Sequence, residues 1–183
     1  GIAPDRLDAT LARVRQARSA GHDVLVTSGG ASVGEYDLMR EVVAAEGASL
    51  GFWKIAMRPG KPLLMADLGP MRLLGLPGNP VASFVCAMIF LVPLLRRLGG
   101  RPVDGDVGED AVLGADLPAN DQRADHLRAR LTVEDGRLVA TPFEVQDSSM
   151  IRVLAESDAL ILRAPYAPAA TAGSMCRVLR LDR

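Results

Sequence analysis

The sequence has few of the residue types that mark specialised protein classes. It holds two cysteines and two histidines in 183 residues, and Cys86 and Cys176 lie far apart in the chain. This spacing excludes a disulfide scaffold and a Cys-x-x-Cys metal site, so we expect both cysteines to be buried small apolar residues. Aromatic residues make up 4%, and the formal net charge is −1. Such a balance gives no general attraction to nucleic acid or to a membrane surface.

Targeting segments and long apolar runs are also scarce. The chain does not open with a basic segment followed by an apolar run, so we expect no secretory signal and a cytoplasmic protein. One apolar run, from Val81 to Leu95, is shorter than the ~20 residues that a membrane span needs, and it contains Pro93. We therefore expect a buried helix at 80–98 that a second domain or another subunit covers.

Hydrophobic periodicity predicts alternating helices and strands over the first hundred residues. Apolar positions at helical spacing indicate helices at 5–20 and 36–46. Compact apolar runs indicate strands at 23–28, 50–56, 63–68 and 71–76, the last two forming a hairpin around Gly69-Pro70. We expect these elements to build an open, mostly parallel α/β sheet with flanking helices.

The character of the sequence changes after Gly99-Gly100-Arg101-Pro102, which ends the long helix. Short β-like runs follow at 111–117, 127–133, 137–141, 159–163 and 175–181, and Asp135-Gly136 is typical of a tight hairpin turn. The sequence thus predicts an α/β domain at 1–100 and a small all-β domain at 101–183, built as a partly open barrel or a sandwich.

A glycine-rich loop from Thr27 to Asp37 joins the carboxyl end of a predicted strand to the amino end of a predicted helix. Glycines at such a place let backbone N–H groups approach an anion that the helix dipole already favours. Asp37 adds a carboxylate, which suggests a bridging metal ion or proton transfer. A plain turn that binds nothing is the alternative.

A second loop, from Met57 to Pro62, contains two prolines and a glycine, which disfavour both helix and central strand. With Lys54, the side chains of Arg58 and Lys61 place three cations within eight residues. This clustering is typical of an oxyanion pocket, and a solvated basic surface loop is the alternative.

A third loop follows the last strand of the first domain. The strand ends at Pro77, Gly78 permits an unusual backbone angle, Asn79 can cap a helix and Pro80 suits the first helical position. The loop therefore presents a helix amino terminus at the edge of the sheet, although the same residues can simply start a helix.

These three loops, in this order, closely resemble the molybdopterin molybdenumtransferases, the MoeA family that includes the gephyrin E domain. The resemblance continues through Gln146-Asp147-Ser148 and Ala172-Gly173-Ser174 and covers essentially the whole chain. It implies a MogA/MoaB-like α/β domain that lacks its first strand and helix, in a fragment of a longer homodimeric enzyme. The implied activity is insertion of molybdate into adenylated molybdopterin with loss of AMP, assisted by Mg²⁺ or another divalent cation.

The resemblance also implies roles for individual residues. Those implied to be catalytic are Asp5, Asp37, Lys54, Arg58 and Lys61, with Asp37 also holding the metal. Those implied to contact substrate are Gly29, Gly30, Ser32, Gly34, Pro62, Pro77, Gly78, Asn79, Pro80, Arg128 and Ser148. Arg58 stands where the family usually has lysine, which keeps the charge but changes the hydrogen-bond geometry toward an oxyanion. Taken by itself, Asp5 reads as a helix N-cap.

Two other functions remain open at this stage. The same fold could serve as a non-catalytic module that binds molybdopterin or dimerises, and the glycine loop could belong to a nucleotide-binding hydrolase. In each case we expect small-molecule ligands, and no nucleic acid or membrane partner.

Overall fold

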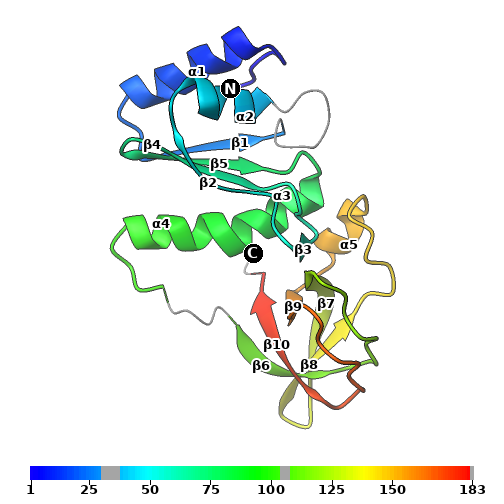
Figure 1. Cartoon of the computed structure of the whole chain (residues 1–183). Helices are drawn as coiled ribbons and strands as arrows, with labels where there is room; N and C mark the ends of the chain where they lie inside the picture. The colour runs from blue at the N-terminus through cyan, green and yellow to red at the C-terminus, as the bar shows by residue number, and fades with distance from the viewer. Residues whose placement is uncertain (30–37, 104–107, 182–183) are drawn as a thin grey trace. The chain divides into compact units, whose positions relative to one another are not determined.

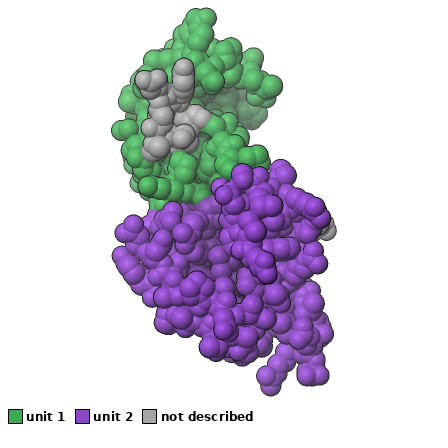
Figure 2. All heavy atoms as spheres, turned by 90° about the vertical axis from the view of Figure 1, so that its right-hand side faces the viewer, with its two compact units in different colours: residues 1–55, 60–92 green, residues 56–59, 93–183 purple. Residues whose placement is uncertain are grey.

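The computed structural model describes residues 1–29, 38–103 and 108–181. The predictions for Gly30, Ser32, Gly34 and Asp37 therefore lie outside the described residues. The chain forms two compact units, one of residues 1–55 and 60–92 and the other of residues 56–59 and 93–183 (Figure 2). The expected boundary between residues 100 and 101 stays a prediction.

The first unit is built on a four-stranded sheet in the order β1-β5-β4-β2 (Figure 1). Its strands are β1 (Val24–Ser28), β2 (Ser49–Trp53), β4 (Leu64–Leu68) and β5 (Met71–Leu76). β1 and β5 are parallel, whereas β4 pairs antiparallel with both β5 and β2. The α/β architecture and the hairpin around Gly69-Pro70 are confirmed. The expectation of mostly parallel pairing is confirmed only for β1 and β5. The other two pairings, β2 with β4 and β4 with β5, are antiparallel.

Two helices, α1 (Leu7–Ser19) and α2 (Leu38–Ala45), cover one face of this sheet (Figure 1). Val14 of α1 and Val42 of α2 are buried in a shared core with β4 and β5. The predicted apolar face of α1 is confirmed, since Leu7 and Leu11 also pack against this core. The capping role expected for Asp5 is wrong: the residue that precedes the helix is Arg6, and its side chain makes no capping hydrogen bond.

The predicted apolar helix is continuous from Pro80 to Leu98, as α3 (Pro80–Cys86), the π-helical turn η1 (Ala87–Leu91) and α4 (Val92–Leu98). By length and composition it is one helix that could cross a membrane, with 22% of its apolar window buried. That test is weak, because core helices of soluble proteins also pass it. Val81, Ala82, Val85 and Cys86 are buried in α3, but η1 and α4 hold no fully buried residue. Within this chain residues 87–98 are therefore at most half-buried, and the expected cover by another domain or subunit stays a prediction.

The second unit is a β barrel. Its strands are β3 (Met57–Arg58), β6 (Glu109–Leu113), β7 (Ala124–Glu134), β8 (Arg137–Pro142), β9 (Ala159–Arg163) and β10 (Met175–Arg180), and a short helix α5 (Ile151–Ala155) precedes β9. β7, β8, β6, β10 and β9 pair in that order, and the additional β7–β9 pairing closes the ring. The all-β domain is thus confirmed, and its barrel is closed rather than partly open.

The residues at 56–59 join the barrel although they come from the middle of the first unit. β3 pairs in parallel with the start of β7, Met57 opposite Ala124 and Arg58 opposite Asp125. The predicted strand at 50–56 is shorter than expected, because Lys54 takes a left-handed backbone angle (φ 65°) that ends the extended chain at Trp53. Sequence analysis placed Arg58 in the first domain, and the observed pairing places it in the second unit.

Candidate functional site

The loop after β1 and the loop after β5 lie against each other at one edge of the sheet. Ser28 and Leu76 are opposite each other in the parallel pair, and the Gly29 N–H donates to the Leu76 carbonyl at 3.2 Å. A side chain at Gly78 would place its first carbon 3.6 Å from the Gly29 Cα. Gly29, the described glycine of the first predicted loop, and the loop after β5 therefore meet at the carboxyl ends of adjacent parallel strands, where open α/β sheets bind their ligands.

The backbone conformation of Gly29 requires a glycine. Its φ of 83° lies in the left-handed region, which a residue with a side chain rarely adopts, and no described atom lies within 4 Å of the position of a first side-chain carbon. Gly78 is exposed, whereas Pro77 next to it is buried. Glycine at both positions leaves the backbone of both loops open to a ligand.

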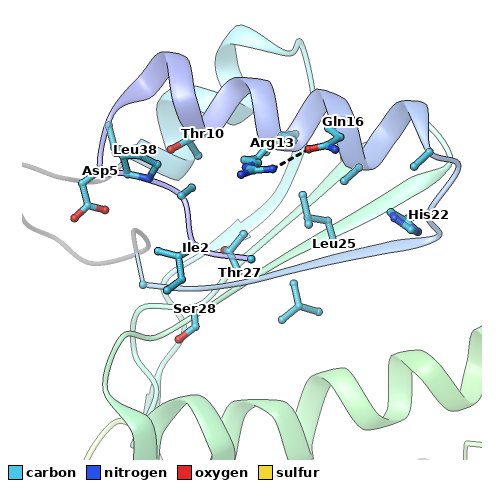
Figure 3. Close-up of a pocket in the computed structure, with 18 residues that line it drawn as sticks. Ile2, Asp5, Thr10, Arg13, Gln16, His22, Leu25, Thr27, Ser28 and Leu38 are labelled. Atoms are coloured by element: carbon cyan, nitrogen blue, oxygen red, sulfur yellow. Dashed lines mark hydrogen bonds between the residues drawn. The ribbon is translucent and has the colours of Figure 1, made fainter.

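Asp5 lies beside the same edge. A hollow of about 770 Å³ between the N-terminal segment, α1 and β1 is lined by Asp5, Ser28 and Gly29 (Figure 3). Asp5 and Ser28 lie at one end of this hollow and His22 at the other (Figure 3). Asp5 makes no hydrogen bond or ion pair within the described parts of the chain. Its carboxylate therefore has no described partner where the residue lines the hollow beside Ser28 and Gly29.

Asn79 and Pro80 start α3 as predicted. The Asn79 side-chain oxygen accepts from the Ala82 N–H at 3.1 Å, and Pro80 occupies the first turn, where its missing N–H costs no helical hydrogen bond. The Ser83 N–H donates to the Asn79 carbonyl at 2.8 Å. These bonds fix the direction in which the loop after β5 enters the helix.

Lys54 and Lys61 lie at the base of one closed loop. The Lys54 N–H donates to the Leu63 carbonyl, and the Ile55 N–H donates to the Lys61 carbonyl, both at 3.0 Å. The Cys86 thiol contacts the Gly60 carbonyl at 3.8 Å, and the Arg58-Pro59 peptide is cis. The predicted constrained loop is thus confirmed, and it brings the backbones of the two lysines side by side, with Pro62 between Lys61 and the start of β4.

Arg58, the third predicted cation, has carboxylate partners in the barrel. Its guanidinium donates to both oxygens of Asp125, Nε at 2.8 Å and the second terminal nitrogen at 2.5 Å, and it lies 3.5 Å from Asp121. The hydrogen bond to Asp125 raises the pKa of Arg58. A gathering of Arg58 with Lys54, Lys61 and Asp37 around one hollow stays a prediction, since the lysines belong to the first unit and Asp37 lies outside the described residues.

Arg128 and the turn that begins at Gln146 form a buried polar cluster at one edge of β7. Arg128 is 1% exposed, and its guanidinium donates to the Asp147 carbonyl at 2.9 Å and to the Gln146 side-chain oxygen at 3.3 Å. Gln146 also donates to the carbonyls of Arg128 and Phe143. These hydrogen bonds connect the turn that begins at Gln146 to Arg128 of β7 and to Phe143, the residue that follows β8. The predicted substrate contacts of Arg128 and Ser148 stay predictions.

A metal site requires clustered ligands. Residues 1–29, 38–103 and 108–181 contain no group of three His, Cys, Asp or Glu side chains placed to hold an ion. Asp5 is the carboxylate that this part of the chain contributes to the hollow beside Gly29. The Mg²⁺ expected at Asp37 therefore stays a prediction, and no step below depends on it.

Sequence analysis did not predict the residues that contact the predicted cations from distant positions in the chain. Asp121 and Asp125 hold Arg58 from more than sixty positions away, and Arg40 of α2 shares the ring of Trp53 with Lys54. The pairing of β3 with β7 places Asp125 opposite Arg58. This pairing was not predictable, because a strand of two residues has no recognisable pattern in the sequence.

Two family models match the chain. Residues 1–97 match the probable molybdopterin binding domain, and residues 110–181 match the MoeA C-terminal region, domain IV. The first match alone covers more than half of the chain.

Individual relatives and solved structures agree with these models. A molybdopterin molybdenumtransferase of Bacillus subtilis is 34% identical over 88% of this chain, and one of Staphylococcus aureus is 28% identical over 86%. The chain spans 37% and 38% of the length of these two curated relatives. A molybdopterin biosynthesis MoeA protein of Pyrococcus horikoshii shares the fold over the whole chain, with a TM-score of 0.79 at 24% identity, and the chain covers 43% of it.

Proposed function

Because the chain belongs to the family of the probable molybdopterin binding domain and carries the MoeA-type C-terminal region, we propose that it works in molybdenum cofactor biosynthesis. The specific reaction we propose is insertion of molybdate into adenylated molybdopterin, with release of AMP. The observation that carries this proposal is the contact between Gly29 and Gly78, which sets two glycine loops together at the carboxyl ends of β1 and β5. Adenylated molybdopterin and molybdate are accordingly the proposed substrates.

In this proposal the glycine loops hold the phosphate of the pterin substrate. The backbone at Gly29 and Gly78 can approach a phosphate closely because neither residue has a side chain. The N-cap bond of Asn79 keeps the loop after β5 in place beside it. A fixed loop after β5 favours catalysis by positioning, since the reacting groups then meet without a further loss of freedom.

The basic residues balance the charges of two anionic substrates. Two like charges ~4 Å apart repel by ~4 kcal/mol at an effective dielectric near 20. Lys54 and Lys61, whose backbones lie together, can offset that repulsion by binding the molybdate oxygens. The departing oxygens of molybdate need protons. Asp5 is the described carboxyl group that lines the hollow beside Gly29, so we assign this proton transfer to Asp5.

The test is to mix the purified chain with adenylated molybdopterin, to add molybdate, and to measure AMP release. We expect AMP to appear only with molybdate present, and Asp5→Asn to slow its release by about 10²-fold. Asp23→Asn, at an exposed carboxylate that precedes β1, is the control and should leave the rate unchanged. AMP release that ignores molybdate, or equal rates for the two variants, would contradict the proposal.

One observation favours a second candidate, a non-catalytic module that binds molybdopterin. Arg58 is held by Asp125 and Asp121, so its charge is already balanced and less available to an oxyanion. Pterin binding that is the same with and without molybdate, and that releases no AMP, would support this candidate over the enzyme.

The remaining expectations are part of the same proposal. They are a MogA/MoaB-like organisation of the first unit, assembly as a homodimer, a divalent cation such as Mg²⁺ and a cytoplasmic location. The relatives named molybdopterin molybdenumtransferase are more than twice as long as this chain, so further parts of such a protein can contribute to the complete site.

A further inference from the structure

Two cations of the first unit share one aromatic ring. The Lys54 Nζ lies 3.8 Å from the centre of the Trp53 ring, and the guanidinium carbon of Arg40 lies 4.1 Å from it. The two charges are therefore no more than about 8 Å apart. An aromatic face attracts a cation because its π-electrons are negative, so the ring holds two charges that repel each other.

The surroundings favour an anion at this place. Arg40 is exposed in the first turn of α2. Neither Arg40 nor Lys54 has a carboxylate partner among the residues that the structure describes, in contrast to Arg58, which has two. Two neighbouring cations that have no carboxylate partner in the described residues are suited to an oxyanion, to which arginine offers parallel N–H donors and lysine a point charge.

The backbone conformation of Lys54 and the Trp53 ring together fix the direction of the Lys54 side chain. A lysine at φ 65° is unfavourable, and hydrogen bonds to the loop 60–63 hold it there. Trp53 packs its ring against the core of the first unit, and its indole nitrogen is buried without a hydrogen-bond partner in the described chain. The faces of the ring, rather than its N–H, therefore make the polar contacts.

We infer that Arg40 is a second oxyanion-binding residue beside Lys54, and that Trp53 positions both. The ligand is a tetrahedral oxyanion, either molybdate or the phosphate of a pterin substrate. This inference rests on the proposed function for the identity of that ligand. The inference assigns a role to Arg40 and Trp53. Both residues lie outside the three loops that carry the resemblance to the family.

Trp53 also provides the measurement, because it is the single tryptophan of the chain. An anion that binds to the two cations changes the electrostatic field at the ring and therefore the emission of Trp53, so sodium molybdate and sodium phosphate can be titrated separately against fluorescence. We expect a saturable change with at least one of them. The stronger binder identifies which group of the substrates the site takes.

Variants separate binding from folding. Arg40→Gln should weaken the binding of that oxyanion about tenfold and reduce its dependence on salt, because one charge-assisted hydrogen bond is lost. Arg40→Lys should recover most of the affinity. Arg18→Gln, at an exposed arginine of the same unit without a ring contact, should stay within about twofold of the unmodified chain. Trp53→Leu, followed by calorimetry, should weaken binding about threefold to tenfold, and Trp53→Phe less, because a weaker aromatic face remains.

Two results would overturn the inference. The first is a folded Arg40→Gln chain, judged by circular dichroism, that binds both oxyanions as the unmodified chain does. The second is no saturable response to either oxyanion. Binding of phosphate that depends on Arg40, together with failure to bind adenylated molybdopterin, would support the oxyanion site and contradict the proposed function alone.

Discussion

Arg58 and Asp125 form a two-pronged ion pair inside the barrel unit, with nitrogen–oxygen distances of 2.8 and 2.5 Å. The Asp125 side chain is 10% exposed and that of Arg58 is 45% exposed. The pair joins β3, a strand of two residues, to the start of β7. Arg58 thus has a structural partner, and a bidentate contact of this geometry is available only to arginine.

Removing this carboxylate should destabilise the barrel unit. Asp125→Asn leaves the Arg58 charge without its partner, and we expect the free energy of unfolding to fall by about 1–2 kcal/mol, between the values for exposed and buried pairs. Urea denaturation measures this change. Asp110→Asn, which removes the 68% exposed partner of Arg177, is the matched control and should cost less than about 0.5 kcal/mol. Equal costs for the two variants would show that the pair does not hold β3.

Gly29 and Gly21 offer a matched pair of backbone tests. Both have left-handed angles, φ 83° and 75°, and at both a first side-chain carbon would meet no atom within 4 Å. Gly29→Ala and Gly21→Ala should therefore each lower the free energy of unfolding by about 1 kcal/mol, through backbone strain alone. Thermal denaturation checks this. A much larger loss for Gly29→Ala than for Gly21→Ala would contradict the expectation that backbone strain is the main cost at both positions.

The stability of the barrel unit should decline in mild acid because of His126. Burial lowers the pKa of His126 below its ordinary value of 6.5, although a hydrogen bond with the Arg58 backbone and the charge of Asp125 oppose the shift. The unfolded chain then binds a proton more readily than the folded chain does. The stability is therefore complete above pH 6.5 and falls as the pH drops from there toward the pKa of the folded state.

Denaturation at pH 7.5, 6.5 and 5.5 measures this slope. His126→Phe should flatten it, and His22→Gln, at the exposed second histidine, should keep it. A slope that survives in His126→Phe would assign the acid sensitivity to another group.

The two cysteines should differ in reactivity. Cys86 is fully buried, and burial raises its pKa to about 12. Cys176 is half-buried in β10, where the sequence had suggested full burial. Because the thiolate is the reactive form, iodoacetamide should label Cys176 of the native chain at least about tenfold faster than Cys86. Mass spectrometry of timed samples tests this, and labelling of Cys86 should reach the same rate only in denaturant.

Features with a local cause were predictable from the sequence. Asn79 caps α3 and Pro80 starts it because both preferences act within one helical turn. Asp135 and Gly136 both take left-handed angles in the turn between β7 and β8, as that pair of residues favours. The short apolar runs of the second domain became strands at nearly the predicted positions for the same reason.

Features that depend on distant partners were not predictable. The charge of Arg58 is the same in a free loop and in an ion pair, and its partner Asp125 is 67 positions away. The half-buried ring of Trp53 carries Arg40 and Lys54, and Arg40 comes from another element, 13 positions earlier in the chain. The direction of β4 depends on which strand lies beside it, and apolar spacing does not reveal strand direction.

In the proposed function, the edge formed by Gly29 and Gly78 binds the phosphate of a molybdopterin substrate. Calorimetric titration of the chain with adenylated molybdopterin, repeated with Gly29→Ala and Gly21→Ala, measures this binding. We expect saturable binding that Gly29→Ala weakens at least about tenfold and Gly21→Ala leaves unchanged, because only the first substitution places a side chain at the edge where backbone N–H groups meet the phosphate. Binding that both variants retain equally, or no binding by the unmodified chain, would contradict it.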